Sequence, residues 1–120
     1  MPFVFAEATT PQGKPLLRIH VRDEVTITDA EALGARIEDD GPNHRWRILS
    51  VVEKGTEYSP AARRYFPNLQ PKYGAIAVAV TSPIVRAAIN MMMRLTGQAP
   101  NLRLFSSEAE ALAWLDQLEI

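Results

Sequence analysis

The sequence contains no cysteine and only two histidines, His20 and His44, among its 120 residues. Without thiols the chain forms no disulfide, no thiolate zinc site and no cysteine nucleophile. One histidine lies in a predicted strand and the other in a predicted loop, and neither has a metal-ligating companion at a usable spacing. We therefore expect no metal site and no cofactor.

The sequence also lacks an excess of charge of either sign and a long apolar run. Its 13 Lys and Arg against 14 Asp and Glu give a formal net charge of -1 at pH 7, which attracts neither nucleic acid nor an anionic membrane. Charges and Pro83 interrupt the most apolar region, residues 74–95, and its longest uncharged piece is too short for a membrane span of about 20 residues. The chain does not open with a secretory signal pattern. We expect a cytoplasmic protein with no nucleic-acid partner and no membrane insertion.

The remaining composition is that of an ordinary globular domain. Hydrophobic residues make up 47% and charged residues 22% of the chain, close to the average for soluble domains. A chain of this length forms one core of normal depth and not two. We expect a single domain over residues 1–120.

Extended and helical patterns alternate along the chain. Phe3–Ala8 and Leu16–Arg22 flank a cluster of turn residues, which predicts a hairpin. Further strands are predicted at 46–52, 74–80 and 102–105, and helices at 29–39, 60–66, 83–96 and 108–118. The order ββαβαβαβα predicts an α/β fold with a mixed, mostly parallel sheet of about five strands, helices packed against it and the hairpin as an antiparallel edge.

Each predicted helix begins with a residue suited to an N-cap. Two of these residues have capping-box spacing, and the other two precede a proline at the first helical position. The four caps are Thr28 (with Glu31), Ser59, Ser82 and Ser107 (with Glu110).

Charge is unevenly distributed, at -4 over residues 1–40, +7 over 41–105 and -4 over 106–120. In an open α/β sheet, helix N-termini and the carboxyl ends of parallel strands share one edge, where free amides favour anions. The basic and hydroxyl side chains expected near that edge are Lys54, Ser59, Arg63, Ser82, Arg86 and Ser106. Two interpretations stay open: an anion-binding pocket for a phosphate or carboxylate, or basic groups that are solvated or paired with the acidic ends.

The helix predicted at 83–96 has more apolar surface than a half-buried helix needs. Its polar stripe is Arg86, Asn90 and Arg94, and the residues expected to face the sheet are Ile84, Ala88, Met91, Met92 and Leu95. The apolar residues left over are Val85, Ile89 and Met93. We expect these three, with Arg86 and Arg63, to form an interaction surface; an apolar ligand or ordinary core packing against residues 60–73 are the alternatives.

The element order, with a short helix after the second buried strand, resembles the STAS domain of anti-sigma-factor antagonists and sulfate-transporter tails. The likeness covers nearly the whole chain and is carried by residues 62–66, 82–86 and 104–115. These stretches resemble those of a divergent bacterial group of stand-alone STAS-like proteins. It implies a STAS-like fold and a non-catalytic regulatory or protein-interaction module, whose partner is another protein or a second copy in a homo-oligomer. The alternative that it implies is a domain that binds a small anion, nucleotide or lipid-like molecule.

One departure from the STAS pattern bears on regulation. Phosphorylatable STAS antagonists carry Asp-Ser-Ser-Gly at the turn into the second helix, and the second serine accepts the phosphate. This chain has Ser59-Pro60-Ala61-Ala62 there, with alanine at the acceptor position, which implies loss of the phosphoserine switch and leaves Ser59 as a helix cap. Because no nucleophile, base and orienting group can be named together, we expect no enzymatic activity.

Overall fold

A five-stranded sheet with strand order β1-β2-β4-β6-β7 is the centre of the computed structural model, which describes residues 2–96 and 101–119. Its strands are β1 (Phe3–Thr9), β2 (Pro15–Val21), β4 (Arg47–Val52), β6 (Ala75–Val80) and β7 (Leu102–Phe105). β1 runs antiparallel to β2, and every other neighbouring pair in this sheet is parallel. The predicted α/β fold class, with a mostly parallel sheet and an antiparallel hairpin edge, is confirmed.

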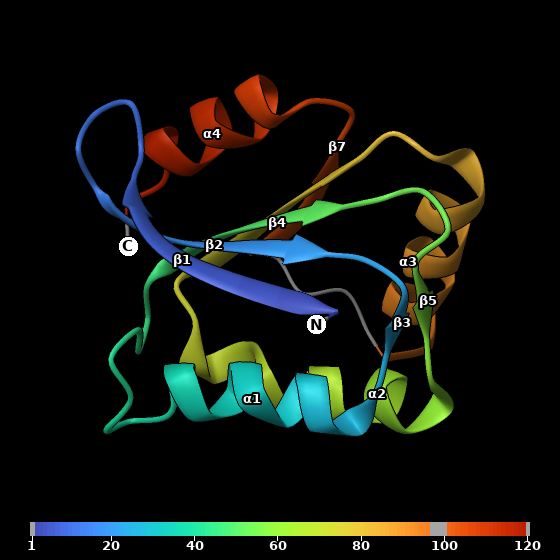
Figure 1. Ribbon diagram of the computed structural model, residues 1–120. Helices are drawn as coiled ribbons and strands as arrows, with labels where there is room; N and C mark the ends of the chain where they lie inside the picture. The colour runs from blue at the N-terminus through green and yellow to red at the C-terminus, as the bar shows by residue number, and fades with distance from the viewer. Residues whose placement is uncertain (1, 97–100, 120) are drawn as a thin grey trace.

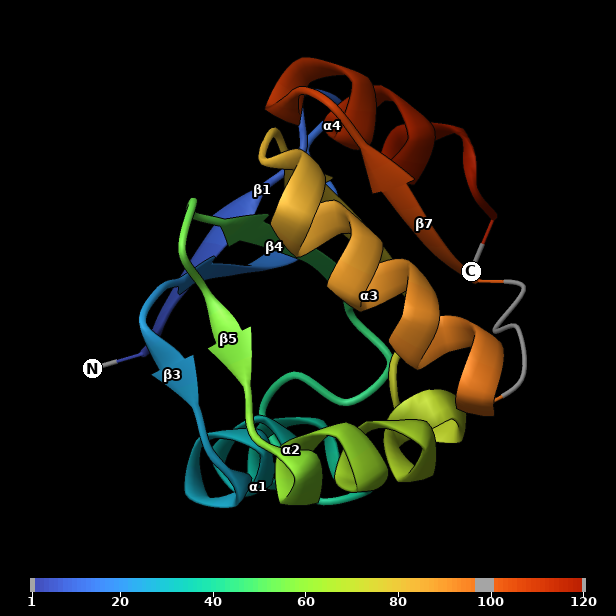
Figure 2. The ribbon, with the colours of Figure 1, turned by 90° about the vertical axis from the view of Figure 1, so that its right-hand side faces the viewer.

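Helices cover both faces of this sheet. They are α1 (Ile27–Ile37), α2 (Pro60–Tyr65), the 3-10 helix η1 (Phe66–Lys72), α3 (Pro83–Thr96) and α4 (Glu108–Gln117). Figure 1 shows α1 and α2 below the sheet and α4 above it. Figure 2 shows α3 in front of the sheet, between β7 and α2.

The two faces of the sheet bury two separate cores. The first packs sheet residues such as Leu17, Ile48 and Val78 against α1, α2 and α3, including Leu33 and Ile89. The second packs Leu16, Leu49 and the alanines of β6 against Ala111 and Leu115 of α4. In β2 the predicted alternation is confirmed, since Leu17, Ile19 and Val21 are buried while Arg18 and His20 are partly exposed.

The sequence pattern misses one pair of short strands. β3 (Glu24–Val25) and β5 (Glu57–Tyr58) form a two-residue parallel ribbon that continues from β2 and β4 toward α1 and α2, visible in Figure 2. This ribbon moves the start of the first helix. Because β3 ends at Val25, Thr26 rather than Thr28 caps α1, and its backbone N–H and hydroxyl both donate to Asp29 Oδ2 at 2.8 and 2.9 Å.

The other three predicted caps are present. Ser59, Ser82 and Ser107 each accept a hydrogen bond from the backbone N–H three residues later, at 3.1, 3.4 and 3.2 Å. The predicted end of the third helix near residues 96–97 agrees with α3 ending at Thr96, and residue 97 lies outside the described residues.

Helices α1 and α2 approach each other at a glycine. A Cβ atom built on Gly34 of α1 would overlap the hydroxyl oxygen of Tyr65 of α2, and it would lie 3.3 Å from the Tyr65 Cζ. The missing side chain at Gly34 therefore lets the two helices lie close together beneath the sheet.

Gly34→Ala is expected to destabilise the fold by about 1 to 2 kcal/mol in urea unfolding, because overpacking at Tyr65 outweighs the helix propensity that alanine gains over glycine. In a Tyr65→Phe background the overlapping oxygen is gone, so the same substitution should cost clearly less. An equal cost of Gly34→Ala in both backgrounds would show that the contact with Tyr65 does not set the helix spacing.

Candidate ligand cavity

A cavity of about 120 Å³ lies in the first core, between the sheet and helices α1, α2 and α3. The cavity is partly open to solvent rather than sealed inside the core. The apolar residues lining it are Phe3, Ile19, Leu33, Ile48, Phe66, Pro67, Leu69, Ile76, Val78, Ile89, Met92, Met93 and Leu102. The polar residues lining it are Ser50, Tyr58, Arg63 and Tyr73.

The cavity lies over a small residue in the central strand. Ser50 of β4 is paired beside Ile19 of β2 and Val78 of β6. Along β4 it stands between Ile48 and Val52, which belong to the same core. Because the serine side chain is shorter than the branched side chains around it, this face of the sheet has a depression at Ser50. Helix α3 lies over this face and lines the space with Ile89, Met92 and Met93.

The structure corrects the orientation predicted for α3. Ile84 and Met91, expected to face the sheet, are 83% and 60% exposed, and Ala88 is exposed as well. Val85 and Ile89, expected on an interaction surface, are buried at 3% and 6% exposure. This side of the helix is turned toward the two hollows, since Ile89 lines the cavity and Val85 lines a second hollow opposite the β5 region.

The other residues predicted for the two sides of α3 lie partly in the core and partly at the surface. Met92 and Met93 are half-buried and line the cavity, while the Leu95 side chain lies outside the described residues. Arg86 is half-buried, and its Nη1 is buried without a hydrogen-bond partner among the described residues. The predicted surface of Val85, Ile89 and Met93 is thus mostly core, which was the alternative that the sequence left open.

A second hollow of about 270 Å³ adjoins the cavity. It is lined by residues of the β5 region, α2 and α3, and it shares Tyr58, Arg63 and Met92 with the cavity. The two hollows therefore meet at these three side chains. Arg63 is exposed, and its guanidinium makes no hydrogen bond or ion pair with any described residue.

The predicted anion-binding residues are not assembled in one pocket. Lys54, Ser59, Ser82 and Arg86 line neither hollow, and only Arg63 does. The hydroxyls of Ser59 and Ser82 instead cap α2 and α3. Lys54 follows β4 and Ser82 follows β6, as expected for the carboxyl edge of the sheet, and anion binding by this group of residues stays a prediction.

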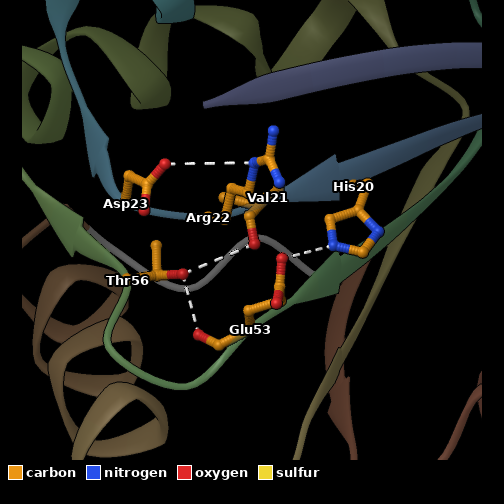
Figure 3. A network of polar contacts seen from close by, with 6 residues as sticks. All are labelled: His20, Val21, Arg22, Asp23, Glu53 and Thr56. Carbon is orange, nitrogen blue, oxygen red and sulfur yellow. Dashed lines mark hydrogen bonds and ion pairs between the residues drawn. The ribbon is translucent and has the colours of Figure 1, made fainter. Parts of the chain in front are cut away.

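A polar network at the ends of β2 and β4 positions the segment that leads to Arg63 (Figure 3). The Thr56 hydroxyl donates to the carbonyls of Glu53 at 2.7 Å and Val21 at 3.4 Å. Beside it, His20 Nε2 lies 2.6 Å from Glu53 Oε2. These contacts hold the turn before β5 in place, and β5 leads directly to the start of α2. His20 is thus paired with Glu53 at the surface of the sheet.

Two tyrosines add hydroxyl groups to the cavity wall. Burial raises the pKa of Tyr58 well above its ordinary value and raises the pKa of Tyr73 to about 12. Both phenols therefore stay protonated at neutral pH and are able to donate a hydrogen bond. Neither phenol is hydrogen-bonded to another described residue.

Within residues 2–96 and 101–119, no group of three or more His, Asp or Glu side chains is placed to hold a metal ion. No helix in the same part of the chain combines the length and apolar character needed to cross a bilayer.

The chain has a STAS-like fold. Its structure is similar to the 2.25 Å crystal structure of an uncharacterized protein of the DUF3478 family from Shewanella loihica PV-4, which is described as having a SpoIIAA-like fold. The TM-score is 0.64 at 13% sequence identity, over 94% of this chain and 93% of that chain. The predicted STAS-like fold is therefore confirmed, and identity this low shows the fold alone.

The chain belongs to the family described as domain of unknown function DUF7793, which matches residues 16–119. A search of the curated proteins finds no match. The function must therefore be argued from the site of this chain.

Ser59→Ala is expected to lower the free energy of unfolding by about 1 kcal/mol, because the Ala62 N–H loses its capping acceptor. Ser59→Asp should keep the stability within a few tenths of a kcal/mol, roughly, because aspartate caps as well as serine does. Urea unfolding of both variants measures the difference. Equal stability of the alanine and aspartate variants would contradict the capping role of Ser59.

Proposed function

We propose that this chain is a non-catalytic regulatory domain of STAS type that binds a small apolar or amphiphilic molecule in the cavity beneath α3. The observation that supports it is the apolar cavity of about 120 Å³. An engineered cavity of about 150 Å³ lined by Leu, Ile and Phe stays dry and binds benzene. By that comparison this cavity suits one aromatic ring or an alkyl chain of about four to six carbons.

The apolar wall of the cavity supports a bound ligand. The cavity is partly open to solvent, so a ligand that fills it removes apolar side chains from contact with water. Binding to the folded chain then stabilises the fold by mass action.

The lining of the cavity favours binding over catalysis. Among the described residues that line it there is no His, Asp, Glu or Lys, so none of them places a carboxylate, imidazole or amine base beside the Ser50 hydroxyl. The phenols of Tyr58 and Tyr73 have raised pKa values, which makes them hydrogen-bond donors rather than bases at neutral pH. A cytoplasmic location is part of the proposal.

A second candidate function is protein binding through the outer face of α3. Ile84 and Met91 are 83% and 60% exposed on that face, with the exposed Ala88 between them. Exposed apolar side chains mark contact surfaces where they form a contiguous patch, and these three residues follow one another at helical spacing on α3. Ligand binding beneath the same helix offers a route by which the cavity regulates this face.

Thermal unfolding with benzene, indole and hexan-1-ol tests the cavity. A ligand at about 100 times its Kd stabilises the fold by about 2.7 kcal/mol, so at least one of these probes should raise the melting temperature. Ser50→Leu should fill the cavity and remove this shift without lowering the melting temperature of the free protein. Ser50→Ala is the matched control, since it keeps the cavity open and should keep the shift.

A second filling variant guards against misfolding of Ser50→Leu. Ile76→Phe enlarges another lining residue from the neighbouring strand β6 and should remove the same shift. The proposal is wrong if no probe stabilises the wild-type chain, or if both filling variants still respond as the wild type does.

A further inference from the structure

We infer that the occupant of the cavity is a monocarboxylate, with its apolar part in the cavity and its carboxylate paired with Arg63 where the two hollows meet. This inference rests on the proposed function and adds the chemistry of the ligand head group. Three observations support it: the position of Arg63, its lack of a partner, and the charges around it.

Arg63 is the one charged residue among the described residues that line the cavity. It also lines the second hollow, and it is exposed, so the Arg63 side chain borders both the apolar wall and the solvent. None of the described residues pairs with it. An unpaired guanidinium beside an apolar cavity favours a ligand that is apolar at one end and anionic at the other.

The surrounding charges favour an anion with a single charge. Residues 41–105, which supply α2, α3 and most of the cavity wall, carry a net +7. Among the described residues, one acidic residue, Glu57, lines the second hollow, and no ion pair joins it to Arg63. A carboxylate matches a planar guanidinium with two parallel hydrogen bonds and equal charge, whereas a single guanidinium leaves a doubly charged phosphate half neutralised.

Tyr58 adds a neutral donor at the same place. Its side chain lines both hollows, as that of Arg63 does. The phenol has no hydrogen-bond partner among the described residues, and an O–H donor strengthens binding of a carboxylate without adding charge. The cavity volume limits the apolar part to one ring or a chain of about four to six carbons.

Calorimetric titration at pH 7 with matched pairs of ligands tests the inference. The pairs are hexanoate with hexan-1-ol and phenylacetate with 2-phenylethanol, which share an apolar part and differ in charge. The wild-type chain should bind each carboxylate about tenfold more tightly than its alcohol, as expected for a charge-assisted hydrogen bond. Raising the salt concentration should reduce this preference, since the pair lies near solvent.

Three variants assign the preference to its residue. Arg63→Gln should abolish the carboxylate preference and leave alcohol binding unchanged, because the apolar wall remains. Arg64→Gln is the matched control, since it removes the adjacent exposed arginine, which lines neither hollow. It should keep the preference. Glu57→Gln should strengthen carboxylate binding, because it removes the one opposing charge that lines the second hollow.

The outcomes separate this inference from the proposed function. If alcohols and carboxylates bind the wild-type chain equally, or if Arg63→Gln keeps the preference, the head-group assignment is wrong and the cavity proposal stands. A preference for hexyl phosphate over hexanoate also overturns the monocarboxylate. If no alcohol or carboxylate binds at all, both the cavity proposal and this inference fail.

Discussion

The position of Ser50 at the centre of the sheet is the constraint on which the site depends. β4 is paired on both sides, with β2 and β6, so its backbone hydrogen bonds fix where each side chain points. The face toward α1, α2 and α3 therefore has a small residue between Ile19 and Val78. The helices cannot close this gap by moving inward, since larger side chains surround it and hold them off. The cavity follows from one short side chain on a rigid strand.

The cavity gives the two ends of the site different roles. Inside it, the wall is apolar and rigid on the sheet side, and it is adaptable on the α3 side, where Met92 and Met93 have flexible thioether chains. At its boundary with the second hollow, a single guanidinium supplies charge. An apolar wall provides most of the binding energy by excluding water, and a charged group at the boundary selects among ligands of the same shape. The STAS-like fold itself carries neither property, because folds host many functions.

Most of the fold could be predicted from the sequence, because its main elements are encoded locally. The alternation in β2, the apolar runs of β4 and β6, and the serines before Pro60 and Pro83 each predict an element without reference to the rest of the chain. The β3–β5 ribbon could not be predicted in this way. Its strands are two residues long and have no period, and they exist because Glu24 pairs with Glu57 across a long stretch of chain. Missing them displaced the predicted cap of α1 by two residues.

The cavity was harder to predict than the fold, because it forms between elements that are far apart in the sequence and depends on how they pack against one another. Helix α3 is apolar on more than one side, so its sequence fixes that it is amphipathic but not which side turns inward. Tertiary packing chose Val85 and Ile89 and exposed Ile84 and Met91. Arg63 was predicted as an anion-binding residue together with other residues at the carboxyl edge of the sheet. In the structure, the residues that line the second hollow with Arg63 come from α3 and the β5 region. The sequence signal at Ser50 is a single polar residue within the apolar run of β4. Such a residue lines a ligand cavity only where the covering helix leaves space above it, and the sequence does not show that space.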